Sequence, residues 1–462
     1  MKIQLFVITI TCLTLAFYAA FIKDYEIITQ VQACHATLIV MLGVLPGMVS
    51  LISRREAGLL PLMPLHGIFY ALIFSLPVFS SKLVLSIESS SELTDALVLI
   101  ILGLICLYVG YYGSRGLYSR SLRPIRFLND VTLKRRIWIA WILYGIYMLL
   151  QLVPALGSLP SLGQLSAPLG YLSTGILFLL ALDNVVSIKH LILVITAIVL
   201  SFTIKLLSGS LAQAVFLLIF LGILYWGKKR SLPWGLIFII CVITTLLNPI
   251  KQTYRQYAQV EVGSAQQSYV FKAKMFYKAT FDHYTNDELA SSDGFDVGVV
   301  NRIGHSLIVF VDVIHMTPEQ VPYWQGESYR TLWTSFIPRF LWHGKPQATI
   351  GNDFGHRYTR LPLGDTTTSE NLPWLPEFYA NFGTLGLMAG MFAVGLLFRF
   401  LVQKLSVPIS CSIEYVLGAT VTFSLFYAES NFALMAGGVL PSYLALLILL
   451  RILTFGSKLA VT

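Results

Sequence analysis

Charged side chains are scarce in this sequence of 462 residues, because Asp, Glu, Lys and Arg together make up only 12% of it. A soluble globular domain carries about 25%. Hydrophobic residues account for 56%, and the mean hydropathy is +0.73. A chain this apolar cannot cover a water-facing surface with polar groups, so lipid must be the solvent for most of it. The composition therefore excludes an ordinary soluble protein.

The sequence also lacks the motifs of several common enzyme classes. It has no Gly-x-x-x-x-Gly-Lys-Ser/Thr loop for nucleotide phosphates and no Gly-x-Ser-x-Gly turn for a serine nucleophile. No His-Glu-x-x-His helix occurs, and the eight histidines match no common metal-ligand spacing. The five cysteines include no Cys-x-x-Cys pair, and all lie in apolar runs. These absences disfavour an ATP-driven transporter and a membrane metalloprotease, and we expect neither a metal nor a cofactor.

Long apolar runs fill most of the chain. A transmembrane helix needs about 20 apolar residues, and twelve runs are candidates: 4–22, 33–52, 59–79, 94–113, 137–156, 161–182, 188–207, 211–226, 232–248, 376–402, 407–427 and 431–453. The sequence therefore predicts an all-helical, polytopic membrane protein in three parts. These are a bundle of about nine spans over 1–248, one large polar loop over 249–375, and about three spans over 376–462.

Short basic loops determine the expected orientation. In a chain with twelve spans, these loops fall on the same side as both termini; they lie near 54–55, 115–136, 189, 228–230 and 399–404. The positive-inside rule assigns that side to the cytoplasm, which puts the 249–375 loop outside. This distribution accounts for the formal net charge of +9. No nucleic-acid motif is present, so we expect no nucleic-acid partner.

Within the large loop, the apolar run 297–316 is interrupted by Arg302, His305, Asp312 and His315. On a helix these four side chains share much of one side. One interpretation is an amphipathic helix at the membrane interface with its polar side in water. The other is a helix whose polar face lines a site for a lipid-linked anion, since an arginine in an apolar helix usually has a partner. The two interpretations are compatible, and both stay open.

Further polar residues follow this run. Arg339, Lys345 and Arg357 stand in a loop rich in Gly and Pro. They could bind the oxygens of a pyrophosphate, or they could be ordinary loop charges in water. Glu377 stands where the loop enters a membrane helix, and it either caps the positive end of that helix or points into a site. Glu429, at another expected helix end, has the same two interpretations.

The order of these segments resembles the Wzy-type oligosaccharide repeat-unit polymerases of bacteria, which elongate O-antigen and exopolysaccharide chains. The similar segments cover about residues 296–390: Arg302 on its apolar helix, Gly-Glu-Ser-Tyr, Ile-Pro-Arg, Trp before Lys-Pro, Gly-x-x-Phe-Gly-x-x-Tyr, and Pro-Glu-x-Tyr-x-Asn-Phe-Gly-x-x-Gly. The resemblance implies a GT-C-like helical fold in the bacterial inner membrane. It also implies transfer of a growing glycan from one undecaprenyl pyrophosphate to a new lipid-linked repeat unit at the periplasmic face.

In such a reaction, positioned cations stabilise the pyrophosphate leaving group, and a base removes the proton of the acceptor hydroxyl. We expect the pyrophosphate to be bound by Arg302, Arg339, Lys345 and Arg357. The candidates for the base are His305, Glu377 and His356. Aromatic and polar residues of the same segments are the candidates for glycan contacts: Tyr329, Trp342, Asp353, Tyr358 and Tyr379.

The implied partners are a lipid-linked oligosaccharide, membrane lipids, a flippase and a chain-length regulator. Two other functions stay as alternatives. An O-antigen ligase would move a finished glycan onto a lipid acceptor, and a transporter or flippase would carry lipid-linked sugars across the membrane. A transporter favours charges inside the spans, and here Asp183 and Lys205 lie near span ends while most polarity lies in one loop.

The loop charges predict a topology that reporter fusions can test. A reporter fused after Arg126 is expected to read cytoplasmic, and one fused after Ser291 is expected to read periplasmic, because the positive-inside rule orients the spans between them. The opposite reading at either position would contradict the outward assignment of the large loop.

Overall fold

The computed structural model describes residues 28–53, 56, 59–80, 90–116, 131–153, 156, 159–208, 210–260, 269–285, 295–335, 337, 342, 344–346, 349–407, 409 and 412–454. The chain divides into two compact units, which we describe separately. Unit 1 comprises 1–125, 300–407 and 421–444, and unit 2 comprises 126–299, 408–420 and 445–462.

Helices make up the regular structure, and no strand occurs among the described residues. Eight helices are long and apolar enough to cross a membrane: Gln30–Ile52, Leu62–Phe79, Ser91–Gly113, Leu162–Leu182, Ile188–Leu207, Leu211–Lys229, Trp374–Leu405 and Phe432–Thr454. The protein is therefore all-helical in its described part and embedded in a membrane. The predicted span 4–22 lies outside the described residues.

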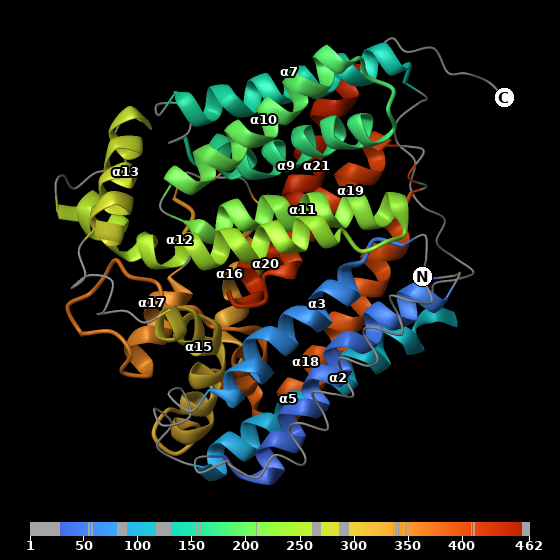
Figure 1. The fold of residues 1–462 in the computed structure, drawn as a ribbon. Helices are drawn as coiled ribbons and strands as arrows, with labels where there is room; N and C mark the ends of the chain where they lie inside the picture. The colour runs from blue at the N-terminus through green and yellow to red at the C-terminus, as the bar shows by residue number, and fades with distance from the viewer. Residues whose placement is uncertain are drawn as a thin grey trace. The chain divides into compact units, whose positions relative to one another are not determined.

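In unit 1, helices far apart in the sequence lie side by side (Figure 1). These are α2 (Gln30–Ile52), α3 (Leu62–Tyr70, continued by η1 Ala71–Ser75 and η2 Leu76–Phe79), α5 (Ser90–Gly113) and α18 (Trp374–Leu405). The α5–α18 contact depends on Gly110 and Gly395. A Cβ atom at Gly110 would overlap the Phe392 carbonyl, and one at Gly395 would overlap the Leu107 carbonyl. Without a hydrophobic effect between helices in lipid, such close backbone approach is a main source of helix association.

Helix α18 is bent back on itself. Phe382 (φ −145°, ψ 18°) and Gly383 (φ 66°, ψ −156°) interrupt it, and glycine adopts that positive φ without strain. Trp374 and Phe398 would be about 36 Å apart in a continuous helix at 1.5 Å per residue, yet their ring centroids are 6.1 Å apart. A short arm, 374–381, therefore runs back along a long arm, 384–405. The sequence predicted one continuous span over 376–402, since nothing in its hydropathy marks this turn.

Three basic segments meet at one end of unit 1. Arg399 Nη1 donates to Glu56 Oε1 at 2.9 Å, and Arg115 Nη2 lies 3.0 Å from the same oxygen. Tyr111 Oη donates to Glu56 Oε2 at 3.3 Å. Glu56, Arg115 and Arg399, the last near the end of α18, come from three segments that the sequence assigns to one side of the membrane, and the structure brings these segments together. The α5 helix begins at the opposite end, where Glu92 contacts His315 of α15.

Helix α15 (Phe295–Met316) and the short helix α17 (Ile350–Arg357) complete the part of unit 1 that carries the candidate site. The apolar side of α15, including Val309 and Val313, packs on Trp324, Phe354 and other buried side chains. Because this side is buried, the polar side of α15 is directed toward the surrounding loops.

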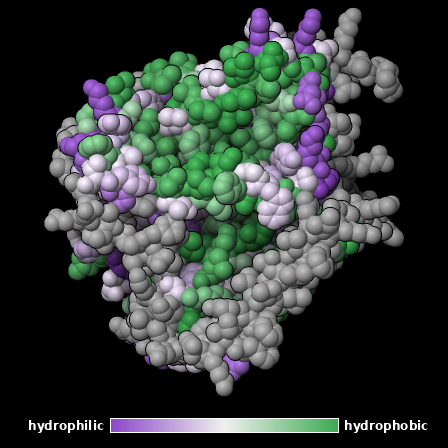
Figure 2. All heavy atoms as spheres, in the orientation of Figure 1, coloured by the Kyte–Doolittle hydropathy of each residue, from purple (hydrophilic) through white to green (hydrophobic). Residues whose placement is uncertain are grey.

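Unit 2 is a second helical bundle. It contains α7 (Leu133–Leu152), α9 (Pro160–Leu182), α10 (Ile188–Leu207), α11 (Leu211–Lys229), α12 (Trp234–Val260), α13 (Tyr269–Thr285), most of α19 (Ser412–Phe423) and the end of α21 (Val439–Thr454). Hydrophobic side chains cover much of the visible surface over α10 and α11 (Figure 2). On α10, Ile192 and Val199 are more than half exposed, as expected for side chains that face lipid.

Two features of the central region differ from the expected segmentation. Helix α12 continues through residue 249, where the large loop was expected to begin. Residues 249–299 belong to unit 2, whereas 300–375 belong to unit 1. The large polar stretch is thus distributed over two compact units.

The glycine contact predicts a difference between two neighbouring alanine substitutions. Gly110→Ala is expected to lower the free energy of unfolding by about 1–3 kcal/mol, because the added methyl group must displace the α18 backbone. Gly113→Ala is the matched control on the same helix, since a Cβ there meets no atom within 4 Å. Thermal unfolding of the detergent-purified variants measures the difference. Equal midpoints would show that α5 and α18 do not depend on this approach.

Candidate functional site

The polar side of α15 contacts charged partners from other segments of unit 1. His305 Nε2 lies 3.2 Å from Glu370 Oε1, and Asp312 accepts a hydrogen bond from Arg360 Nη1. His315 Nδ1 lies 2.5 Å from Glu92 Oε1. The helical spacing predicted a shared face for these side chains, and the structure shows which groups that face meets.

Glu370 connects two of these contacts. Its Oε1 atom is shared by His305 and by Arg360 Nε, which donates at 2.9 Å. The hydrogen bond with His305, together with Arg360, lowers the pKa of Glu370 to about 2. The carboxylate is therefore ionised at neutral pH. A carboxylate beside one ring nitrogen fixes the tautomer and orientation of a histidine, which leaves the other nitrogen free to accept a proton. We call His305, Glu370, Arg360 and Asp312 the base cluster.

Arg357 lies at the end of α17, three residues before Arg360. Its Nη2 atom is 2.5 Å from Glu327 Oε2, and its guanidinium lies 4.6 Å from the Trp324 ring centroid. A guanidinium has five N–H donors, so one ion pair leaves donors for a further anion. The side chain is 38% exposed. Arg357 can therefore contact a ligand, but Glu327 already offsets its charge.

A fully buried carboxylate, Glu377, connects the short arm of α18 with residues 326–328 and with Phe432. Ser328 Oγ donates to its Oε1 at 2.7 Å, and the Phe432 amide donates to its Oε2 at 2.6 Å. Asn381 Nδ2 donates to Ser328 Oγ at 2.9 Å, while its Oδ1 accepts from the Gly326 amide at 2.8 Å. We call this network the Glu377 hub. Both carboxylate oxygens accept hydrogen bonds from the protein, and the backbone donor is the Phe432 amide at the start of α20 (Phe432–Gly437), whereas the cap expected from the sequence was on α18 itself.

The other predicted ligands of the pyrophosphate are only partly described. Lys345 Nζ donates to the Ile337 carbonyl at 3.0 Å. Arg302 lies within α15, but its side chain is outside the described part, and Arg339 lies outside the described residues altogether. Of this predicted set, Arg357 is the residue that the structure brings close to the hub, through Glu327.

The remaining predicted residues lie around α17 and the hub. His356 Nε2 lies 2.9 Å from the Asp365 carbonyl, and Asp353 accepts from Thr349 Oγ1 at 2.9 Å. Tyr358 is buried, with its hydroxyl 2.6 Å from Thr317 Oγ1. These contacts connect α17 with the residues around it.

Three aromatic candidates differ in exposure. The Tyr329 ring lies beside that of Phe378, and burial raises the pKa of its phenol, so it stays protonated. Tyr379 packs partly buried against the α15 core, whereas Trp342 is 38% exposed. Of these three, Trp342 is the one with a substantial surface for a sugar face.

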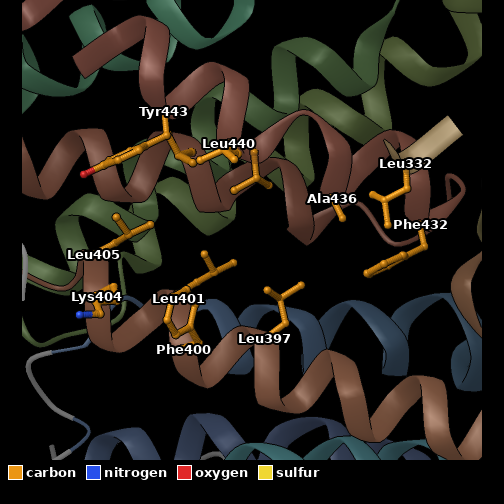
Figure 3. Close-up of a pocket in the computed structure, with 12 residues that line it drawn as sticks. Leu332, Leu397, Phe400, Leu401, Lys404, Leu405, Phe432, Ala436, Leu440 and Tyr443 are labelled. Atoms are coloured by element: carbon orange, nitrogen blue, oxygen red, sulfur yellow. The ribbon is translucent and has the colours of Figure 1, made fainter. Parts of the chain in front are cut away.

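An apolar groove of about 470 Å³ lies in the same unit (Figure 3). Its lining is apolar except at one end, where Lys404 and Tyr443 stand. The lining residues are Leu332, Leu397, Phe400, Leu401, Lys404, Leu405, Val421, Phe432, Ala436, Val439, Leu440 and Tyr443. Phe432 belongs to this lining, and its amide is also bound by Glu377. The groove therefore adjoins the hub, and its chemistry suits a hydrocarbon chain.

Sequence reasoning missed Glu370, Arg360 and the role of Ser328. Arg360 and Asp312 are 48 residues apart, and no local pattern links them. Ser328 was part of the Gly-Glu-Ser-Tyr segment, yet its contact with Glu377 spans 49 residues. Among the residues that the structure describes, no group of three or more His, Cys, Asp or Glu side chains could hold a metal ion.

One family model matches most of the chain. It is described as Domain of unknown function (DUF8712), and it covers residues 126–460. No curated protein and no solved structure matches the sequence.

The Glu377 hub predicts a stability cost for an isosteric change. In Glu377→Gln, one acceptor oxygen becomes an NH₂ group. Facing the Phe432 amide, it meets a donor; facing Ser328, it donates to Oγ, which already accepts from Asn381, and the hydroxyl hydrogen loses its acceptor. An unsatisfied buried group of this kind costs about 1–3 kcal/mol. Thermal unfolding in detergent measures it, with exposed Glu319→Gln as the control. If Glu377→Gln keeps wild-type stability and loses activity, Glu377 is a reacting group and the hub assignment is wrong.

Proposed function

The chain belongs to the DUF8712 family, and we propose that it is a membrane-embedded glycosyltransferase that polymerises lipid-linked oligosaccharide repeat units. In this proposal the donor is a glycan on a polyprenyl pyrophosphate, and the acceptor is a hydroxyl of a second lipid-linked unit. The observation that carries the proposal is the presence, in one compact unit, of an oriented histidine and an apolar groove. An enzyme acting on a polar headgroup with a long lipid tail needs both.

The base cluster supports the acid–base half of the reaction. If His305 Nε2–H donates to Glu370, Nδ1 is the basic atom that takes the proton of the acceptor hydroxyl. Glu370 then stabilises the imidazolium that forms. Asp312 and Glu370 together offset the charge of Arg360, so this cluster suits a neutral sugar hydroxyl better than an anion.

The leaving group requires cations elsewhere. As the bond between the sugar and the pyrophosphate oxygen breaks, negative charge develops on the pyrophosphate, and the new glycosidic bond forms to the acceptor oxygen. Of the four cations predicted to bind the pyrophosphate, Arg357 and Lys345 have described side chains, and Arg302 and Arg339 are the further candidates. Donors placed where charge develops lower the barrier more than they stabilise the bound substrate. The polyprenyl tail would lie in the groove.

We further propose twelve spans in a GT-C-like arrangement in a bacterial inner membrane. Eight candidate spans are described. The other four would be 4–22, α7, the apolar part of α12 (Trp234–Asn248) and Ile413–Phe426, the last two being apolar helices shorter than the eight. With both termini in the cytoplasm, the meeting point at Glu56 would be cytoplasmic and the base cluster periplasmic.

The proposal predicts that each of four substitutions reduces chain elongation. His305→Ala, Glu370→Gln, Arg357→Lys and Arg302→Lys are each expected to reduce polymerisation about 30- to 1,000-fold, which corresponds to about 2–4 kcal/mol of transition-state stabilisation. Lysine keeps the charge of arginine but loses its forked geometry. Glycan banding in strains with matched protein levels measures the effect.

Exposed Arg330→Lys, in the same loop, is the control and should give wild-type banding. If the His305 and Glu370 variants make glycan chains of normal length, the assignment of His305 as the base is wrong. A deletion strain that accumulates finished but unattached glycan chains would instead indicate a ligase, and unaltered chains would exclude both activities.

A further inference from the structure

Unit 2 contains a buried lysine inside an apolar helical bundle. Lys205, near the end of α10, is only 7% exposed. Its Nζ atom lies 4.8 Å from the centroid of the Tyr171 ring. An ionisable residue in a membrane helix is costly, and it commonly marks a functional site. The base cluster and the Glu377 hub belong to unit 1, so they give Lys205 no role.

Hydroxyl groups lie one turn before this lysine on α10 and near its partner Tyr171. Ser201, one turn before it on α10, donates to the Ala197 carbonyl at 2.8 Å and lies 3.4 Å from the Tyr144 hydroxyl. Tyr147 stands next to Ser201, and its hydroxyl is buried. Tyr144, Tyr147, Tyr171, Ser201 and Lys205 form what we call the Lys205 cluster.

Further polar side chains form hydrogen bonds one turn along the neighbouring helices. Gln151 Nε2 donates to Ser166 Oγ at 2.5 Å, and Tyr269 Oη donates to the Gln151 carbonyl at 3.1 Å. Polar side chains of α7, α9, α10 and α13 are thus gathered near one end of unit 2. Such a gathering is unusual among helices whose other faces are apolar.

The charge of Lys205 has no counterpart in the described part of unit 2. Among those residues, the Tyr171 ring faces its ammonium group and no carboxylate does. Asp183 pairs with Lys228 at 2.5 Å, and Asp282 accepts from Tyr257. An ammonium group has three donors and no acceptor, and the Tyr147 hydroxyl can also donate. An anion with several acceptor oxygens could accept hydrogen bonds from both the Lys205 ammonium group and the Tyr147 hydroxyl.

We propose that the Lys205 cluster binds the phosphate group of an anionic lipid. A lipid is favoured as the source because α10 presents apolar, exposed side chains, among them Val199 and Leu200, along which an acyl chain can lie. Lys205 lies two residues from the end of α10 at Leu207, which is the depth where lipid headgroups meet the hydrocarbon. The proposal is independent of the glycan-transfer function.

The experiment compares thermal unfolding of the full-length, detergent-purified protein with three probes: phosphatidylglycerol, diacylglycerol without a phosphate, and inorganic phosphate. A ligand that binds only the folded state raises the unfolding midpoint. Phosphatidylglycerol is expected to raise the midpoint of the wild type, and diacylglycerol is not. The concentration that gives half the effect should rise at least about tenfold in Lys205→Met and less in Tyr147→Phe, with one donor lost.

Lys189→Met is the matched control, because Lys189 is exposed on the same helix. It should respond to phosphatidylglycerol like the wild type. Without ligand, Lys205→Met should be at least as stable as the wild type, since replacing an unpaired buried charge with a hydrophobic side chain is often stabilising. The measurement without ligand keeps the test decisive if Lys205→Met fails to fold, because misfolding of this variant would itself contradict the proposal.

Each result decides the assignment. A response to phosphatidylglycerol alone that depends on Lys205 supports a lipid phosphate. An equal response to inorganic phosphate supports the anion site but overturns the lipid source. If Lys205→Met is less stable without ligand, or responds to phosphatidylglycerol like the wild type, Lys205 is a structural partner of Tyr171 and the site does not exist.

Discussion

A backbone that leaves the helical conformation among apolar helices must find partners for its N–H and C=O groups, because lipid offers none. Unit 1 has two such breaks, the turn of α18 at 382–383 and the segment 427–431 before α20 (Phe432–Gly437). The Glu377 hub satisfies groups at both breaks. Backbone bonds add to it, from Trp324 to Ala380, from Gln325 to Asn381 and from Trp374 to Ala428. The rest of the candidate site is built on this set of bonds.

The hub also explains how the site can be rigid although its residues come from distant segments. Ser328 and Gly326 belong to the turn that carries Glu327, the partner of Arg357. The same turn follows Trp324, whose ring packs against the α17 core. A displacement of the short arm of α18 would therefore move Arg357 as well. The hub therefore couples the positions of side chains that are far apart in the sequence.

Sequence reasoning succeeded where one physical property dominates and failed where partners are distant in the chain. Apolar runs predicted the long helices because membrane thickness sets a minimum length. The 3.6-residue period predicted the shared face of His305, Asp312 and His315. The bend at Gly383 escaped notice because hydropathy reports burial and carries no information on backbone direction. Glu370 lies in a loop without periodicity, so its contact with His305 could be seen only in three dimensions.

The ion pairs at Glu56 have a consequence for biosynthesis. Glu56 and Arg399 are separated by 343 residues, and ribosomes add about 5–20 residues per second. About 20–70 s therefore pass between the synthesis of Glu56 and the synthesis of Arg399. Arg115, the other arginine that contacts Glu56 in the folded protein, follows much sooner. The addition of Arg399 to the contact between Glu56 and Arg115 would then accompany the packing of α18 against helices already in the membrane.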